Sequence, residues 1–390
     1  MPSPSATPAP PSVVPSATPP PAVGAAPAGP WSSLAWVDAG PMPIIAPTGS
    51  QTFILNVFGW SGGYVAFGSN GGNDGTDNPQ PITLMTSSST DGVHWSAAKS
   101  IDLHGFTDSV QIAGVAAAPG AVLALGEYPA DTCGGPQTLA GIWRSTDGVA
   151  WSRPALSADM QKGGIETLDG GPAGFIATGV HHDGTQAVWL SLDGAAWRGA
   201  PLPIVTSGKL VVQDGHSVAG GLVLSGAVVG PEGCGGASAI HPAVWWSADG
   251  KQWAREPLPG ASSSADVTLW TEKIADDALV AIEGAGDRPK VYWSTADGRT
   301  WRKLAVASED AGFGMIGDGR HAIVANSGDG TGPIMLTEVA NDLTTTPMLQ
   351  SGASPMQAEN GPGWNFAVGP TGVLAVASDG SSVRLGVPGG

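Results

Sequence analysis

Seven short apolar runs recur along the chain, and glycine bounds most of them. Each run has six or seven residues, mainly Ala, Val, Leu, Ile and Gly. Runs of this length between turn-forming residues are typical of β-strands. They occupy residues 63–68, 120–126, 174–179, 221–226, 278–284, 321–326 and 372–377. The recurrence predicts seven copies of one strand-based unit.

A seven-residue phrase, [S/T]-x-D-G-x-x-W, follows the first five runs. Its copies span residues 89–95, 145–151, 191–197, 247–253 and 295–301. Successive copies start 56, 46, 56 and 48 residues apart, which is the length of one four-stranded sheet with its loops. Such a unit cannot bury its apolar face alone, so the copies must stack. We predict an all-β fold, a seven-bladed β-propeller of four-stranded antiparallel blades; six blades with one irregular insertion is the alternative.

The phrase also predicts the order of strands within a blade. An inner strand, such as residues 110–116, precedes the apolar run, the third strand ends in the phrase, and an outer strand begins near its tryptophan. A further tryptophan stands two residues before the Ser or Thr of four copies, where the first copy has Ser87. Alternate residues of a strand point to one face, so this tryptophan and the hydroxyl residue share a face of the sheet. These four residues are Trp143, Trp189, Trp245 and Trp293.

The residue types of the phrase suit a self-contained hairpin turn. Glycine tolerates a positive φ angle, and the aspartate and hydroxyl oxygens can accept hydrogen bonds from N–H groups of the turn. The tryptophan adds about 150–250 Å² of apolar surface that pins the outer strand. We therefore interpret these aspartates and tryptophans as structural. They are Asp91 and Trp95, Asp147 and Trp151, Asp193 and Trp197, Asp249 and Trp253, and Asp297 and Trp301.

The two ends of the chain are expected to meet, because an open ring leaves strand edges exposed. Residues 31–38 (WSSLAWVD) look like an outer strand without a blade, and the last blade otherwise stops at residues 382–387. We predict that this N-terminal strand closes the propeller and that residues 31–390 form one domain. Residues 2–30 contain only Pro, Ser, Ala, Thr, Val and Gly, which predicts a disordered stalk over residues 1–30.

The stalk and the charge of the chain bear on location and partners. Such stalks follow a secretion signal or a lipid-anchored cysteine in exported bacterial proteins, so we expect an extracellular or cell-surface location; a disordered cytoplasmic tail is the alternative. The formal net charge of −17 disfavours nucleic acid and anionic membranes. No apolar run reaches the roughly 20 residues that span a bilayer, so no membrane insertion is expected. We expect a monomer.

Cys133 and Cys234, in similar glycine-rich contexts, would form a disulfide in an oxidising compartment; two free thiols are the alternative.

The phrase resembles the Asp-box, or bacterial neuraminidase repeat, usually written S-x-D-x-G-x-[T]-W. The residue between Asp and Gly is missing in all five copies, so the match is to a shortened variant. The resemblance covers residues 84–301 directly and, through the strand pattern, most of residues 31–387. It implies a propeller, whereas Asp-box propellers include sialidases, other glycoside hydrolases, sorting receptors and photosystem assembly factors.

The sialidase machinery that the resemblance would imply does not map onto the chain. Sialidases have an Arg-Ile-Pro motif before the first box, three arginines for the substrate carboxylate, and a Tyr/Glu pair. No Arg-Ile-Pro occurs here, and the segment from residue 31 to the first box lacks arginine. The arginines cluster beside the phrases, on the side opposite the expected ligand face. They are Arg144, Arg153, Arg198, Arg255, Arg299 and Arg302.

The expected ligand face collects the loops between second and third strands and those between blades. A glycosidase would need two carboxylates about 5–10 Å apart on this face. The carboxylate candidates on this face are Asp74, Asp77, Asp108, Asp131, Glu166, Asp183, Glu232, Asp266 and Asp287. His181, His182 and His241 are further ligand-face candidates. The oxygen-rich residues 70–78 are a weak calcium candidate and the histidines a weak zinc candidate, so we expect no cofactor. We predict a non-catalytic binding module or interaction platform for a glycan or protein partner; an extracellular glycoside hydrolase is the alternative.

Overall fold

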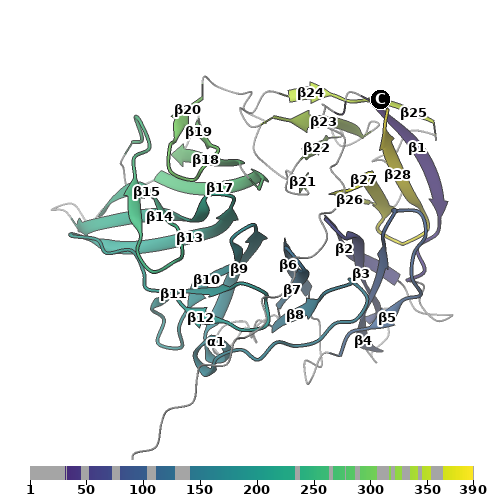
Figure 1. Cartoon of the computed structure of the whole chain (residues 1–390), viewed down its shortest axis with the longest axis horizontal. Helices are drawn as coiled ribbons and strands as arrows, with labels where there is room; N and C mark the ends of the chain where they lie inside the picture. Colours follow the sequence, from purple (N-terminus) through teal and green to yellow (C-terminus); the bar gives the residue numbers. More distant parts are fainter. Residues whose placement is uncertain are drawn as a thin grey trace, which may run out of the picture.

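Seven sheets follow one another around a ring in the computed structural model (Figure 1). The structure describes residues 31, 33–44, 52–72, 80–102, 111–127, 141–232, 238–262, 267–276, 278–285, 290–304, 316–317, 321–326, 334–340, 345–352 and 363–389. Each sheet is one blade, so the prediction of a seven-bladed β-propeller is confirmed and the six-bladed alternative is wrong. The part of the chain that the structure describes contains one short helix, α1 (Ala158–Lys162), between blades 2 and 3.

The inner strands line the axis and contact one another in a closed circle. In blade order they are β2 (Thr52–Trp60), β6 (Gln111–Ala118), β9 (Gly164–Gly171), β13 (Lys209–Val218), β17 (Val267–Ala275), β21 (Ile316–Gly317) and β26 (Trp364–Gly369). All seven apolar runs form second strands, as predicted. These are β3 (Gly63–Gly72), β7 (Ala121–Glu127), β10 (Gly174–Val180), β14 (Gly221–Glu232), β18 (Ala278–Ala285), β22 (Ala322–Asn326) and β27 (Gly372–Ala377).

The third strands of blades 1 to 5 end on the Ser or Thr that opens the repeated phrase, which confirms the predicted strand order. Third strands are β4 (Gln80–Ser89), β8 (Gly141–Ser145), β11 (Gln186–Ser191), β15 (Ser238–Ser247), β19 (Val291–Thr295), β23 (Met335–Val339) and β28 (Val383–Pro388). Outer strands are short: β5 (Lys99–Ser100), β12 (Arg198–Gly199), β16 (Ala254–Glu256), β20 (Arg302–Lys303) and β24 (Thr345–Pro347). In blade 2 a single bridge between Arg144 and Ser152 takes the place of an outer strand.

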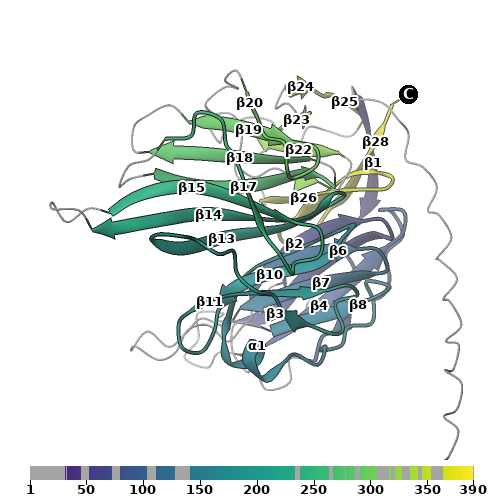
Figure 2. The ribbon, with the colours of Figure 1, turned by 60° about the vertical axis from the view of Figure 1, so that its left-hand side comes forward.

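The N-terminal strand closes the ring. β1 (Ser33–Gly40) pairs antiparallel with β28, so residues from the two ends of the chain share blade 7 (Figure 2). A further strand, β25 (Leu349–Gly352), leads out of blade 6 and pairs parallel with β1, which makes blade 7 five-stranded. The predicted closure is confirmed, and this additional parallel strand was not predicted.

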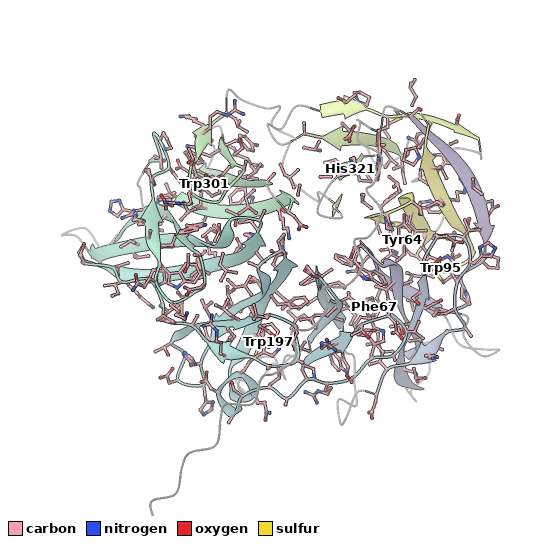
Figure 3. All side chains as sticks on the ribbon, viewed as in Figure 1. Tyr64, Phe67, Trp95, Trp197, Trp301 and His321 are labelled. Carbon is pink, nitrogen blue, oxygen red and sulfur yellow. The ribbon has the colours of Figure 1, made fainter. Side chains whose placement is uncertain are left out.

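The hydrophobic core is divided among the interfaces between blades. Seven clusters of buried apolar side chains are formed, one between each pair of neighbouring blades. Trp143, Trp189, Trp245 and Trp293 are almost fully buried, and each packs toward the preceding blade. Trp95, Trp197 and Trp301, which end three copies of the phrase, lie in separate blades (Figure 3). The blades therefore hold together chiefly by apolar burial between them.

Candidate functional site

Many predicted ligand-face residues lie outside the described residues. These are Asp74, Asp77, Asp108, Asp131, Asp266 and Asp287, together with Cys133 and Cys234. Most of the proposed calcium segment, residues 73–78, also lies outside them. Glu232 is placed only as the last residue of β14. Glu166, His181, His182, Asp183 and His241 are described.

The described candidates of blade 3 do not converge on one centre. Nδ1 of His181 lies 2.8 Å from Oδ1 of Asp159 in α1. Asp183 accepts hydrogen bonds from the hydroxyl and the N–H of Thr185, and these two bonds lower the pKa of its carboxyl. Glu166 and His182 are exposed. No three metal-ligating side chains gather within the described residues, so a zinc site is not assembled there.

The repeated phrases form five nearly identical turns. In the copy of blade 3, the hydroxyl of Ser191 accepts the N–H of Gly194 at 2.8 Å. Oδ1 of Asp193 accepts the N–H groups of Ala195 and Ala196 at 2.9 and 3.2 Å, and the bond from Ala195 contributes most to a lowered pKa of this carboxyl. Gly194 has φ of +73°, and a Cβ there would lie 2.7 Å from a methyl group of Leu123. The turn thus satisfies its own polar groups.

Arginines tie successive turns together. Nε of Arg144 donates to the main-chain oxygen of Asp193 at 2.7 Å, and Nη2 of Arg198 donates to that of Asp249 at 2.6 Å. The guanidinium of Arg299 lies over the ring of Trp246, 4.6 Å from its centroid. Each of these arginines is therefore engaged within the ring and is not directed at a substrate carboxylate.

A groove of about 430 Å³ opens beside blade 4 where the chain passes to blade 5. We call it the rim groove. Its lining consists of His241, Pro242, Arg255, Glu256, Pro257, Leu258, Ala261 and Ser262. Ser262 donates both its N–H and its hydroxyl to the buried carboxylate of Glu283, which fixes one wall. Among the ligand-face candidates whose side chains the structure describes, only His241 contributes to this lining.

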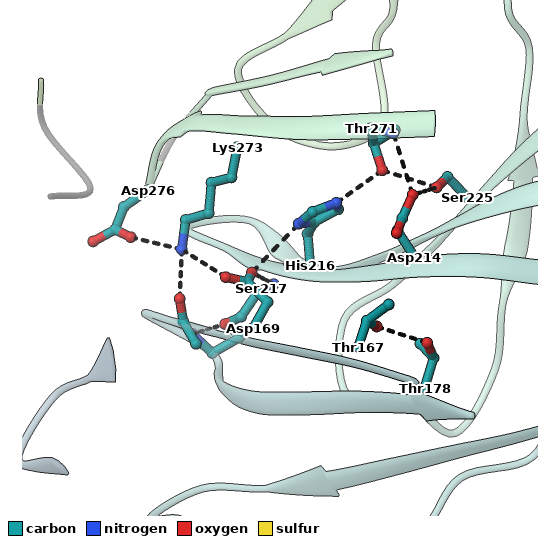
Figure 4. Close-up of polar contacts among 12 residues, drawn as sticks. Thr167, Asp169, Thr178, Asp214, His216, Ser217, Ser225, Thr271, Lys273 and Asp276 are labelled. Atoms are coloured by element: carbon teal, nitrogen blue, oxygen red, sulfur yellow. Dashed lines mark hydrogen bonds and ion pairs between the residues drawn. The ribbon is translucent and has the colours of Figure 1, made fainter. Parts of the chain in front are cut away.

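A second group of polar side chains lies on and beside the inner strands of blades 3, 4 and 5, with Ser225 on β14 and Asp276 just after β17 (Figure 4). This axial cluster consists of Asp169, Asp214, His216, Ser217, Ser225, Thr271, Lys273 and Asp276. Oδ2 of Asp169 accepts the N–H of Ser217 at 2.9 Å and lies 3.5 Å from Nδ1 of His216. Burial raises the pKa of Asp169, but the positive charge of Lys273 and the contact with His216 outweigh burial and lower it overall.

Lys273 crosses from blade 5 to blade 3. Its ammonium nitrogen lies 3.8 Å from Oδ1 of Asp169 and 3.1 Å from Oδ1 of Asp276. It also donates to the carbonyl of Gly170 on β9. The side chain is 15% exposed, so two carboxylates and a carbonyl compensate a largely desolvated charge.

Two hydroxyl groups continue the chain of polar contacts beyond the imidazole of His216. Its Nε2 lies 2.8 Å from Oγ1 of Thr271, which in turn lies 2.8 Å from Oγ of Ser225. Hydroxyl, imidazole and carboxylate in this order are also found in nucleophilic catalysis. Thr271 is 6% exposed and Ser225 is fully buried, so a substrate would not reach either hydroxyl. The arrangement serves the contact between blades.

Neither the rim groove nor the axial cluster was predicted. The axial cluster has a sequence signal, because polar and charged residues stand close together on two inner strands: Asp214 and His216 on β13, and Thr271 and Lys273 on β17. Glu283 likewise places a charge inside an apolar run. The groove has no comparable signal, because its wall depends on how residues 257–262 fold against blade 5.

The propeller topology rests on the seven sheets of the structure itself, and comparison with known proteins finds only remote similarity. No family model and no curated protein matches the chain. A sialidase of Trypanosoma rangeli is 13% identical with a TM-score of 0.36, over 76% of this chain and 53% of its own, so this chain spans about half the sialidase. The BP39L lectin of Burkholderia pseudomallei is 13% identical with a TM-score of 0.44, and the match covers 92% of this chain and 96% of the lectin. The β-propeller domain of the trilobed protease of Pyrococcus furiosus is 12% identical with a TM-score of 0.48, and the match covers 84% of this chain and 92% of that domain. The chain is a β-propeller, and at these similarities the neighbours say nothing about its activity.

Proposed function

We propose that the protein is a non-catalytic binding propeller that takes a peptide segment of a protein partner in the rim groove. The observation that carries the proposal is the lining of this groove. Arg255, Glu256 and His241 stand beside Leu258 and two prolines, and none of the three forms an ion pair or side-chain hydrogen bond within the described residues. A groove of this volume with a few convergent polar groups is typical of a ligand site.

The composition of the groove favours a peptide over a sugar or a hydrolysed glycoside. Glycoside hydrolysis uses two carboxylates across a cleft, and among the described residues of this lining only Glu256 is acidic. The lining that the structure describes also has no aromatic ring on which a sugar could stack. Arg255 and Glu256 can instead pair with charged peptide side chains, while Leu258 offers an apolar contact.

We further propose that the repeated turn is a shortened Asp-box and that the propeller acts outside the cell on a stalk. The composition of residues 2–30 supports this location. Within the described residues, no helix has the length and apolarity needed to cross a membrane. Biotinylation of intact cells of the native host with a membrane-impermeant reagent tests the location. Labelling of the protein only after cell lysis would contradict it.

The binding proposal is tested with a random peptide library displayed on phage and selected on the immobilised protein, with a glycan array probed in parallel. The affinity of the best peptide is then measured by calorimetry for wild type, Arg255→Ala and the control Arg302→Ala, an exposed arginine of β20. We expect Arg255→Ala to weaken binding at least about tenfold, as for an arginine that anchors an interface. Array binding without peptide binding, or turnover of chromogenic glycosides, would contradict the proposal.

A further inference from the structure

His216 lies between the inner strands of three blades. It is carried by β13 of blade 4, and its two ring nitrogens face Asp169 of blade 3 and Thr271 of blade 5 (Figure 4). The side chain is 11% exposed, so water does not replace a lost partner easily. The charge state of a single imidazole therefore bears on contacts across two blade interfaces.

In the charged form of His216, each ring nitrogen faces a partner. Nδ1 lies 3.5 Å from Oδ2 of Asp169, an ion-pair contact without a hydrogen bond, and Nε2–H donates to Oγ1 of Thr271. The hydroxyl of Thr271 can then donate to Ser225, whose hydroxyl donates to Oδ2 of Asp214 at 3.5 Å. One carboxylate faces the imidazolium directly, and a second is connected to it through two hydroxyls.

The neutral form loses one of these contacts in either tautomer. If Nδ1 keeps its proton, Nε2 must accept from Thr271, the hydroxyl of Ser225 must turn toward Thr271, and Asp214 loses that donor. If Nε2 keeps its proton, a lone pair of Nδ1 faces the carboxylate of Asp169. We propose that protonation of His216 determines which group donates in each hydrogen bond of this chain of contacts. The stability of the packing between blades 3, 4 and 5 therefore depends on pH.

The charged groups around His216 determine the sign of the response. Asp169 faces it from β9, Asp214 from β13, and Glu272 and Lys273 from β17. Burial lowers the pKa of His216, but Asp169 and Asp214 outweigh burial and Lys273, so the pKa is raised overall. A raised pKa means that this stabilisation is fully present below about pH 6.5 and is lost as the pH rises through the folded-state pKa. Burial also raises the pKa of Glu272, so this carboxyl contributes a separate loss of stability as the pH rises above its ordinary pKa of about 4.5.

Thermal unfolding of the full chain tests the proposal. Tm is measured for wild type, His216→Gln and the exposed control His182→Gln at about pH 6 and about pH 8.5. We expect the wild-type Tm to fall by about 2 °C for each unit by which the pKa of His216 is raised. His216→Gln should remove at least half of that fall, and His182→Gln should keep it. An equal fall in all three proteins, or no fall in wild type, would overturn the proposal.

A spectroscopic readout applies even if His216→Gln does not fold. The ring nitrogens of wild type are followed by NMR through the same pH range, with His216 assigned by substituting the other six histidines one at a time. We expect His216 to carry protons on both nitrogens at about pH 6 and to titrate above about 6.5. A single protonated nitrogen at about pH 6, or a midpoint below the ordinary value, would overturn the proposal.

Discussion

The axial cluster and the rim groove both hold charged side chains but use them differently. In the axial cluster, the side chains of His216, Lys273 and Asp169 are only 11%, 15% and 21% exposed, and each has an oppositely charged neighbour. In the rim groove, Arg255 is exposed and forms no ion pair within the described residues. Paired, desolvated charges hold neighbouring blades together, whereas unpaired charges at an open groove remain available to a ligand.

The largest effect is expected at the centre of the axial cluster. Asp169→Ala leaves Lys273 and His216 without their shared carboxylate and should lower the free energy of unfolding by about 3–5 kcal/mol. Chemical denaturation monitored by tryptophan fluorescence measures this change. Glu166→Ala, an exposed position of the same strand, serves as the control and should stay within about 0.5 kcal/mol of wild type. A similar stability for both variants would show that the axial cluster does not stabilise the contact between blades.

A smaller effect is expected at the repeated turns, whose contacts are local. Asp193→Ala removes the acceptor of two N–H groups at an exposed turn and should cost about 1–2 kcal/mol, measured by the same denaturation. Because the pKa of Asp193 is lowered in the fold, its contribution is present above its ordinary pKa and is lost as the pH falls through the folded-state value. The difference between wild type and Asp193→Asn should therefore shrink in acid. A difference that grows in acid would contradict the geometry of the turn.

Double-mutant cycles sharpen the contrast between local and non-local contacts. Asp193 and Asp297 lie in separate turns, so Asp193→Ala and Asp297→Ala should add within about 0.5 kcal/mol. Asp169→Asn and His216→Gln act on one pair and should couple by at least about 1 kcal/mol. Additive effects within the axial pair would show that its members act independently, and coupling between the turns would show that they are not self-contained.

The difference between local and non-local contacts also explains what the sequence could predict. The phrase around Asp193 carries its own hydrogen-bond partners within four residues, and the apolar runs specify second strands, so blade number and strand order were readable. The pairing of β1 with β28 followed from the need to close a ring. The contact of Lys273 with Gly170 joins residues more than 100 positions apart, and no local pattern encodes it. Arg255 lies on the outer strand β16, and its part in the groove depends on how residues 257–262 fold beside it, which no local pattern encodes.

The smallest effect on folding is expected at the rim groove. Arg255 is exposed and forms no ion pair with any residue that the structure describes, so Arg255→Ala should change the free energy of unfolding by less than about 0.5 kcal/mol. Denaturation at neutral pH measures it against Arg302→Ala. A large loss of stability would mean that Arg255 supports the fold, and its effect on binding could then not be assigned to the ligand.

Binding of one selected peptide to three folded variants tests the central claim most directly. Calorimetry below the unfolding transition compares Asp169→Asn, Asp193→Ala and Arg255→Ala with wild type. The account predicts that the first two bind as wild type does, despite their lower stability, and that Arg255→Ala binds at least about tenfold more weakly. Normal binding by Arg255→Ala together with loss of binding in Asp169→Asn would contradict it and would place the ligand at the axis.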